Sequence, residues 1–344
     1  MSGSTLSLQQ HASAYLTHWR GLGRRYRQEE WLLKVLQREL PVLGYQDLTR
    51  ESFTAWQQSR KDRHPNSRRK WAQLIRHFCR FRQRSEPDCF VPGEELACRL
   101  HPYVTPVIVT NAQIARMISA ADELVPSPNS PLRSESIRVA VVLLYTTGMR
   151  IGELVRLRMQ DVEDGGALLR ICDSKFHKSR LLPLSPSTQA ELLRFLAARA
   201  DTHFDSRGTA ALLSTSHRTA PKAYTAAAQR AYGLTTYRRG GSGPYSMTGL
   251  QKAITRLFVL SGVADASGRT PRVHDLRHSF AVQALARWYR QQADIQVQLP
   301  KLAMYMGHVS IESTAHYLRL TEEVAALASD RFEMHFAGVI GAQS

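Results

Sequence analysis

The segment MGHVSIESTAHYLRL, residues 306 to 320, places a tyrosine nine positions after a histidine. A tyrosine phenol becomes a nucleophile when a neighbouring group takes its proton, and a nearby histidine can donate a further hydrogen bond. Buried tyrosines with a bonded hydroxyl are nevertheless commoner than catalytic ones. The segment therefore leaves two roles open for Tyr317, packing and nucleophilic attack, and His308 is the candidate partner for the second.

Two arginines that are far apart in the chain have the chemistry to stabilise a phosphodiester under attack. Arg150 lies in TTGMRIGEL and Arg277 in PRVHDLRHSFA. Each guanidinium offers paired donors to nonbridging oxygens, so the two would form a clamp on a charged transition state. His274 precedes Arg277 by three positions on one helical face and could exchange a proton with the phenol. These residue types predict phosphoryl transfer to a protein hydroxyl.

The oxygen that leaves in such a reaction needs a proton, and the stretch DSKFHKSRLLPL contains two lysines. Lys175 and Lys178 lie in a basic turn between two apolar runs, which predict a small β-hairpin. A lysine stays protonated at neutral pH, and a turn lets its ammonium group move toward a substrate. No carboxylate cluster and no His/Cys set has metal-ligand spacing, so we expect neither a metal nor a nucleotide cofactor.

Each candidate also has an ordinary structural explanation. Arg150 stands at a predicted helix start beside Glu153 and could simply pair with it. Histidines on either side of Arg277 could be satisfied core residues. We interpret the remaining polar neighbours as structural (His278 and His316), as supporting (Glu153 and Asp161), or as surface or DNA-facing (His177).

The composition indicates a polyanionic partner. The chain has 344 residues, 43% of them hydrophobic, and a formal net charge of +17. Such a charge is typical of nucleic-acid binding, although charge alone does not separate DNA from RNA. No N-terminal apolar stretch or membrane anchor is apparent, and the four cysteines lack the spacing of a disulfide scaffold. We expect a cytoplasmic, nucleoid-associated protein with reduced thiols.

Apolar spacing predicts two helices in the N-terminal part. One spans residues 24–40, with Trp31, Leu32, Val35, Leu36 and Leu40 on its inner face. The other runs from Ser67, as N-cap, to about residue 84, with Trp71, Leu74, Ile75 and Phe78 inside. Between residues 60 and 84 the only acidic residue is Asp62. The outer face of the second helix carries a basic stripe, made of Arg69, Arg76, Arg80 and Arg84. We predict that this stripe contacts phosphates.

A proline-rich stretch at about 86–106 separates this part from a second domain. There, a helix at 134–147 is apolar nearly all round and ends at Gly148, so it should be central to a core. A short helix should follow in IGELVRLR. Further helices are predicted at 187–199, 247–260, 274–289, 301–306 and 311–327.

The four motifs, in this order after a basic helical region, resemble those of the tyrosine recombinase, or phage integrase, family. The resemblance covers residues 107–327. It implies a mainly α fold: a helical DNA core-binding domain (1–92), a linker (93–106), a mostly helical catalytic domain with a small antiparallel β-sheet (107–330) and a tail (331–344). It also implies the catalytic set Arg150, Lys175, His274, Arg277, His308 and Tyr317.

Within this resemblance, the register of the hairpin favours Lys175 as general acid and leaves Lys178 as a DNA contact. The family's reaction implies attack by Tyr317, a 3′-phosphotyrosine link and strand exchange between double-stranded DNA recombination sites. Four protomers would take part, as a homotetramer or with sister recombinases. His274 and His308 are 34 positions apart, more than in the commoner family pattern, and this is similar to transposon-borne members.

Three other classes remain as alternatives. A type IB topoisomerase would use a similar site to relax supercoils without synapsis, but the basic N-terminal domain and the hairpin favour a recombinase. A noncatalytic regulator would not need all six candidate residues. An RNA-binding protein would explain only the charge.

Overall fold

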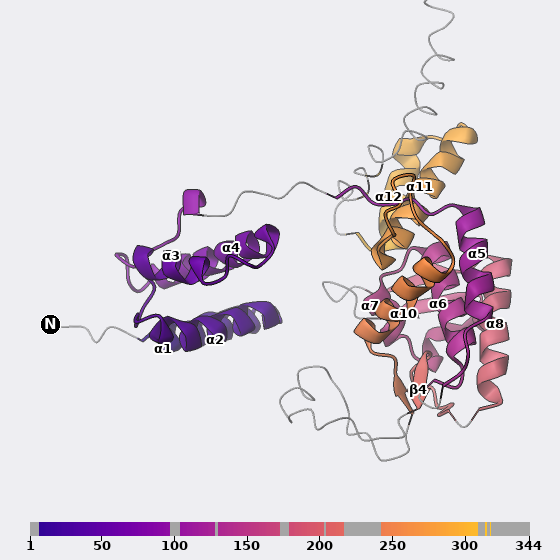
Figure 1. Cartoon of the computed structure of the whole chain (residues 1–344), viewed down its shortest axis with the longest axis horizontal. Coiled ribbons are helices and arrows are strands. Elements are labelled where there is room, and N and C mark those ends of the chain that lie inside the picture. Colours follow the sequence, from indigo (N-terminus) through magenta and orange to yellow (C-terminus); the bar gives the residue numbers. More distant parts are fainter. Residues whose placement is uncertain are drawn as a thin grey trace, which may run out of the picture. The chain divides into compact units, whose positions relative to one another are not determined.

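The computed structural model describes residues 7–96, 104–127, 130–172, 179–202, 204–216 and 242–308, together with Thr314 and Tyr317. The chain divides into two compact units, Met1–Val104 and Thr105–Ser344. In both units the described residues are mainly helical, and the second unit adds small antiparallel sheets (Figure 1). This confirms the predicted fold class.

The first unit is built from helices and a short 3₁₀ turn. They are α1 (Leu8–Gly21), α2 (Arg27–Val42), α3 (Arg50–Gln58), α4 (Pro65–Arg82) and η1 (Glu94–Leu96). The sequence analysis anticipated α2 and α4 but not α1 or α3. The predicted start of α4 was wrong by one turn, because His64 caps the helix through its side chain and Pro65 occupies the first helical position.

The core of the first unit contains most of the residues that helical spacing selects. Leu32, Val35, Leu36 and Leu40 are buried, and so are Ile75 and Phe78 of α4. Trp31 is an exception, since its exposed fraction is 47%. It lies at the rim, where its ring is 5.8 Å from that of Trp71. The prediction that Trp31 faces inward was therefore wrong.

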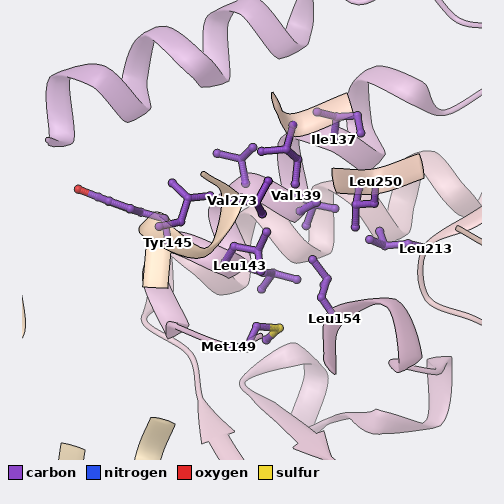
Figure 2. Close-up of a cluster of buried hydrophobic side chains, with 14 of the residues drawn as sticks. Ile137, Val139, Leu143, Tyr145, Met149, Leu154, Leu213, Leu250 and Val273 are labelled. Atoms are coloured by element: carbon purple, nitrogen blue, oxygen red, sulfur yellow. The ribbon is translucent and has the colours of Figure 1, made fainter. Parts of the chain in front are cut away.

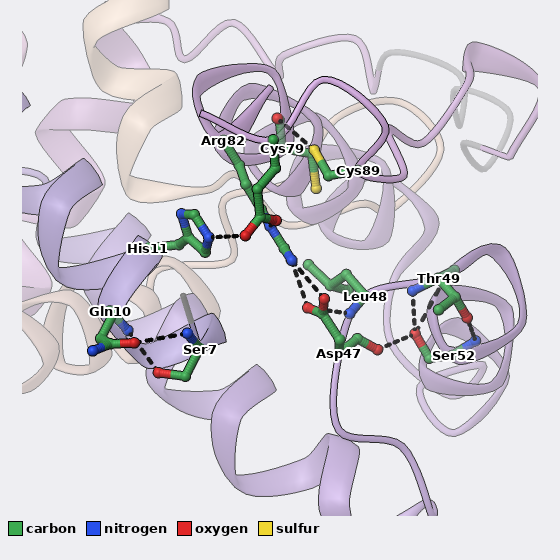
Figure 3. A network of polar contacts seen from close by, with 11 residues as sticks. Ser7, Gln10, His11, Asp47, Leu48, Thr49, Ser52, Cys79, Arg82 and Cys89 are labelled. Carbon is green, nitrogen blue, oxygen red and sulfur yellow. Dashed lines mark hydrogen bonds and ion pairs between the residues drawn. The ribbon is translucent and has the colours of Figure 1, made fainter. Parts of the chain in front are cut away.

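A polar network ties α4 to other parts of the first unit (Figure 3). Arg82 is buried and donates to both carboxylate oxygens of Asp47, at 2.5 and 2.6 Å, and to Glu86 at 2.6 Å. Glu86 in turn contacts His11 Nε2 at 2.8 Å. Asp47 and His11 are distant in sequence from α4, so this arginine finds its acids outside the stretch 60–84.

The second unit is built around a central helix, α6. Its described helices are α5 (Asn111–Asp122), α6 (Arg133–Thr147), α7 (Ile151–Arg156), α8 (Pro186–Ala200), α10 (Met247–Leu260), α11 (Val273–Arg290) and α12 (Ile295–Met306). Ile137, Val139, Leu143 and Leu144 of α6 are all buried, and side chains from α7, α10 and α11 pack around them (Figure 2). The all-round apolar pattern of α6 thus reflects burial on every side.

The larger sheet has the order β1–β2–β3, with β1 (Val162–Glu163), β2 (Leu168–Ile171) and β3 (Arg180–Pro183) antiparallel. Leu168 pairs with Pro183 and Ile171 with Arg180, which confirms the predicted hairpin strands. The short turns η2 (Met159–Asp161) and η3 (Asp164–Gly166) flank β1, and a second pair joins β4 (Ser214–Ser216) to β5 (Ser242–Pro244). The hairpin turn itself, residues 173–178, lies outside the described residues.

Two helix ends prepare the site. Gly148 ends α6 in the left-handed conformation, with φ of 61°, and a side chain there would collide with Phe280. Gly307 ends α12 in the same way, with φ of 69°. Both glycines permit a sharp exit from a helix, and the carbonyl of each accepts a hydrogen bond from an arginine, Arg277 at Gly148 and Arg150 at Gly307. Among the described helices, none has the length and apolar character needed to cross a membrane.

Candidate active site

Three helix ends bring together the candidate residues that the structure describes. Arg150 is the N-cap of α7, His274 and Arg277 lie in the first turns of α11, and His308 follows the end of α12. The ring of Tyr317 packs near His308, with ring centroids 6.1 Å apart and planes inclined by 19°. Five of the six predicted catalytic residues therefore lie in one place.

Arg277 is a buried cation whose described hydrogen bonds are to main-chain oxygens. Its exposed fraction is 2%, and it donates to Gly148 O at 2.6 Å and to Met306 O at 2.9 Å. These carbonyls belong to the ends of α6 and α12, where the helix dipole is negative. Burial, with Arg150 nearby, lowers the pKa of Arg277 to about 10, so the guanidinium is charged at neutral pH.

Arg150 is paired with Glu153, as its alternative explanation proposed. Arg150 Nη1 donates to Glu153 Oε1 at 3.0 Å, and the backbone N–H of Arg150 donates to Oε2 at 2.9 Å. Its other terminal nitrogen, Nη2, donates to Gly307 O at 3.1 Å. The side chain keeps an exposed fraction of 29%, much more than that of Arg277. The pair fixes the guanidinium without removing it from solvent.

Sequence reasoning missed Arg180, the first residue of β3. Arg180 Nη2 donates to Glu153 Oε2 at 2.8 Å, and Nε donates to Tyr305 O at 2.8 Å. Glu153 is thus bonded by two arginines, and they hold its pKa at about 2 although burial alone would raise it. The available signal was the position of Arg180 at the start of an apolar strand, where an inward-facing charge needs a buried partner.

Two histidine rings, those of His278 and His308, lie beside the ring of Tyr317. The His278 ring makes edge contacts with both His274 and Tyr317, at centroid distances of 4.8 and 5.4 Å. His308 Nδ1 bonds Thr314 Oγ1 at 2.7 Å. Tyr317 itself is buried, in a cluster with Leu302 and Met306. The tyrosine therefore packs against the core and also lies among the candidate proton carriers.

Burial and neighbouring positive groups lower the pKa of these histidines. Burial, followed by the neighbouring arginines, lowers the pKa of His308 to about 4. Burial and the adjacent His274 lower the pKa of His278 to about 4. For His274, partial desolvation by the surrounding protein and the charge of Arg277 also lower the pKa. A lowered pKa favours the neutral form of His274, which can accept a proton from a phenol and so suits the role of base.

The hairpin lysines and two of the other motif residues are not described. Lys175, Lys178, His177 and His316 lie outside the described residues, so the choice between the two lysines stays a prediction. Within the described ranges, no three His, Cys, Asp or Glu side chains gather as metal ligands would. The expectation of no metal and no cofactor also stays a prediction.

The predicted DNA-contacting stripe lies in the first unit, with Arg69, Arg76 and Arg80 on α4 and Arg84 just beyond its end. Arg80 and Arg84 are exposed, whereas Arg76 donates to Pro92 O at 2.7 Å and to Glu94 at 2.9 Å. Arg69 is partly exposed. The acids that compensate this stretch come from neighbouring segments, so counting charges within residues 60–84 overestimated the free positive charge of the stripe.

Comparison with known proteins agrees with this geometry. Residues 108–323 match the model of the phage integrase family. Among curated proteins, an integrase/recombinase of Sinorhizobium fredii, y4rE, is 35% identical over 66% of this chain and 64% of its own length. A second from the same organism, y4rB, is 30% identical over 95% of this chain and 97% of its own.

A solved structure shows the same fold. The Tn1549 transposon integrase, in complex with a circular intermediate DNA, superposes with a TM-score of 0.61 at 16% identity, over 95% of this chain and 100% of that one. The family match covers more than half of the chain, and the alignment with y4rB covers nearly the whole of both proteins. The chain belongs to the phage integrase family of tyrosine recombinases.

Proposed function

We propose that the chain is a site-specific DNA recombinase that breaks and rejoins strands through a tyrosine–DNA intermediate. The observation that carries this proposal is the convergence of Arg150, Arg277, His308 and Tyr317, from three separate parts of the sequence, at the ends of α7, α11 and α12. Membership of the phage integrase family and the relatives named as integrase/recombinases support it.

In the proposed reaction, Tyr317 Oη attacks the scissile phosphorus while the bond from phosphorus to the 5′-oxygen breaks. His274 takes the phenol proton, and Lys175 gives a proton to the departing 5′-oxygen, which becomes a hydroxyl. Arg150 and Arg277 stabilise the nonbridging oxygens. A 5′-hydroxyl then attacks the 3′-phosphotyrosine and releases the tyrosine, so no external energy source is consumed.

The assembly is also part of the proposal. Strand exchange needs two DNA sites and four tyrosines, which four protomers would supply, either as copies of this chain or with sister recombinases. The protein would then act at the nucleoid. The relation of the chain to a transposon integrase fold supports a mobile-element substrate, with integration, excision or transposition as the outcome.

A nicked suicide duplex tests the proposal. Its sequence would come from inverted repeats in the DNA flanking the coding region, and the nick would let the short 5′-hydroxyl product diffuse away after cleavage. Wild-type protein should form an adduct that survives denaturant, and Tyr317→Phe should form none while binding the same DNA with nearly the same affinity. Adducts that persist in Tyr317→Phe would contradict the assignment of the nucleophile.

A further inference from the structure

Three arginines from three different elements donate hydrogen bonds to the end of α12. Each guanidinium bonds one of three successive carbonyl oxygens: Arg180 Nε bonds Tyr305 at 2.8 Å, Arg277 Nη2 bonds Met306 at 2.9 Å and Arg150 Nη2 bonds Gly307 at 3.1 Å. The last carbonyls of a helix lack intrahelical donors and carry its negative pole. His308 follows at once, so these contacts hold the backbone immediately before this candidate catalytic residue.

Arg180 differs from Arg150 in how its donors are used. Nε, Nη1 and Nη2 all donate to protein acceptors, with Nη1 3.2 Å and Nη2 2.8 Å from the two oxygens of Glu153. The exposed fraction of its side chain is 11%, against 29% for Arg150. Arg180 therefore has little capacity left for a phosphate, whereas Arg150 remains open to one.

The shared carboxylate explains what Arg180 adds. The side chain of Glu153 has an exposed fraction of 1%, so its charge must be balanced inside the protein. If Arg150 were its only partner, one positive and one negative charge would cancel at the place where a phosphate has to bind. With Arg180 as the second partner, the group of Arg150, Arg180 and Glu153 keeps one net positive charge.

The contact between Arg180 and the end of α12 also depends on the backbone at Gly307. Gly307 has φ of 69°, and a β-carbon at this position would lie 2.7 Å from Arg180 Nη1. A side chain at this position would be strained by the left-handed backbone and would displace the guanidinium from the end of α12. Arg180 begins β3, whose hairpin carries Lys175, so the same side chain connects the hairpin strand, α7 and α12.

Resting on the proposed recombinase function, we propose that Arg180 is a positioning residue: it neutralises Glu153 so that Arg150 is free to bind the scissile phosphate, and it holds the hairpin strand against the α12 end. It touches no reacting atom. Its effect reaches the phosphate through Arg150 and reaches Tyr317 through the backbone of α12.

The test is a double-mutant comparison of Arg180→Met, Glu153→Gln and the pair together. Single-turnover cleavage of the suicide duplex is measured at saturating DNA, and Kd is measured separately by anisotropy. Arg180→Met should slow cleavage on the order of 10- to 100-fold, with Kd changed less than about threefold, because Glu153 then draws Arg150 away from the phosphate. In the double variant, Glu153→Gln removes the carboxylate charge that Arg180 no longer balances. The double variant should therefore cleave at least about threefold faster than Arg180→Met.

The matched control is Arg138→Met with Glu191→Gln. Arg138 also forms a forked pair, at 2.8 and 2.6 Å, but between α6 and α8. These variants should lower the melting temperature without changing the cleavage rate more than about twofold. If Arg180→Met fails to fold, Arg180→Gln, which keeps a donor but not the charge, replaces it in the same comparison.

The outcomes separate the two proposals. A double variant no faster than the single Arg180 variant would overturn the neutralising role, and a large rise in Kd for the single variant would assign Arg180 to the DNA instead. Arg180→Lys, which restores the charge without the fork, should recover part of the rate. If wild-type protein forms no covalent adduct on any flanking repeat, the recombinase function fails first, independently of these ratios.

Discussion

At the scale of single residues, the arginines show how a buried cation is prepared for an anionic substrate. Arg277 is almost fully buried and is bonded by carbonyl oxygens of Gly148 and Met306. Each terminal nitrogen donates to one carbonyl, but carbonyl dipoles bring no full negative charge. A phosphate that reaches this guanidinium would supply one, and most strongly when charge accumulates in the transition state.

Alanine variants measure this contribution. Arg150→Ala and Arg277→Ala should each reduce the single-turnover cleavage rate on the order of 10²- to 10³-fold or more, as the removal of transition-state donors does. Adduct formation over time, at saturating DNA, is the measurement. A loss of only a few-fold in both variants would mean that the arginines serve the fold alone.

The histidines predict a pH dependence of stability. His278 is buried with a pKa near 4, while an unfolded histidine titrates near its ordinary value of 6.5. Between these two pH values only the unfolded state takes up the proton. The contribution of His278 to the free energy of unfolding is therefore fully present above about pH 6.5 and is lost as the pH falls toward 4. For His278 the loss is on the order of 2 to 3 kcal/mol.

Urea denaturation of the wild-type protein and of His278→Phe, at several pH values from 7.5 to about 4.5, checks this. The variant should show a shallower decline in the free energy of unfolding over that interval. Parallel declines in the two proteins would contradict a neutral, buried His278.

The resemblance of the hairpin to that of the family predicts that Lys175 is the general acid. A positioned lysine is a better donor to a departing alkoxide than arginine, which is effectively never deprotonated. Lys175→Ala should therefore cleave ordinary DNA slowly but recover on DNA with sulfur in place of the scissile 5′-bridging oxygen, since a thiolate leaves without protonation. Arg277→Ala should recover much less. Rescue of Lys178→Ala in place of Lys175→Ala would show that the other lysine is the acid.

The sequence predicted which residue types meet but not how they are held. Arg150, Arg277 and His308 were found because their motifs and spacing are specific. Arg180 was missed because its partners, Glu153 and Tyr305, are 27 and 125 positions away, and no local pattern encodes such contacts. His278 was taken as structural, and its edge contacts with both His274 and Tyr317 appear only once α11 and residue 317 are placed together.

At the scale of elements, periodicity located α2 and α10 well because their apolar stripes are strong, and the all-round apolar run located α6. It failed at the start of α4, where a histidine cap and Pro65 set the boundary, and at the start of α12, which begins at Ile295 rather than at residue 301. The sequence analysis did not anticipate α1, α3 or α5. The residues around the enlarged interval between His274 and His308 form the end of α11 and the start of α12, with Asp294 capping α12. The interval between the two histidines is therefore mostly helical in this chain.

The basic stripe of α4 gives an element-scale prediction. If it follows DNA phosphates, replacing Arg80 or Arg84 by alanine should flatten the dependence of log affinity on log salt by about 0.9 for each phosphate that is no longer neutralised. Arg76→Ala should change this slope less and lower the stability of the first unit instead, because Arg76 is bonded to Pro92 and Glu94. Anisotropy titrations at several salt concentrations, with melting curves, are the measurement.

An unchanged slope in the quadruple variant, with Arg69 also replaced, would show that this face of α4 does not bind DNA. A slope change in Arg76→Ala as large as that in Arg80→Ala would show instead that Arg76 leaves its internal partners when DNA binds.

At the scale of the whole molecule, the order of motifs along the chain identified the family, and the matching region, residues 108–323, agrees closely with the extent of the resemblance. The division into two units follows Val104. Composition alone indicated only a polyanionic partner. The specific expectation of a duplex recombination site came from the motifs, because charge carries no information about which nucleic acid is bound.

The central claim is that Tyr317 becomes covalently joined to a 3′-phosphate of DNA. The most direct measurement is mass spectrometry of the adduct trapped on a nicked suicide duplex, after digestion of both protein and DNA. The account predicts one modified peptide, with a nucleotide attached through its 3′-phosphate to Tyr317 and a free 5′-hydroxyl on the other DNA product. A nucleotide on any other residue, or one attached through a 5′-phosphate, would contradict it.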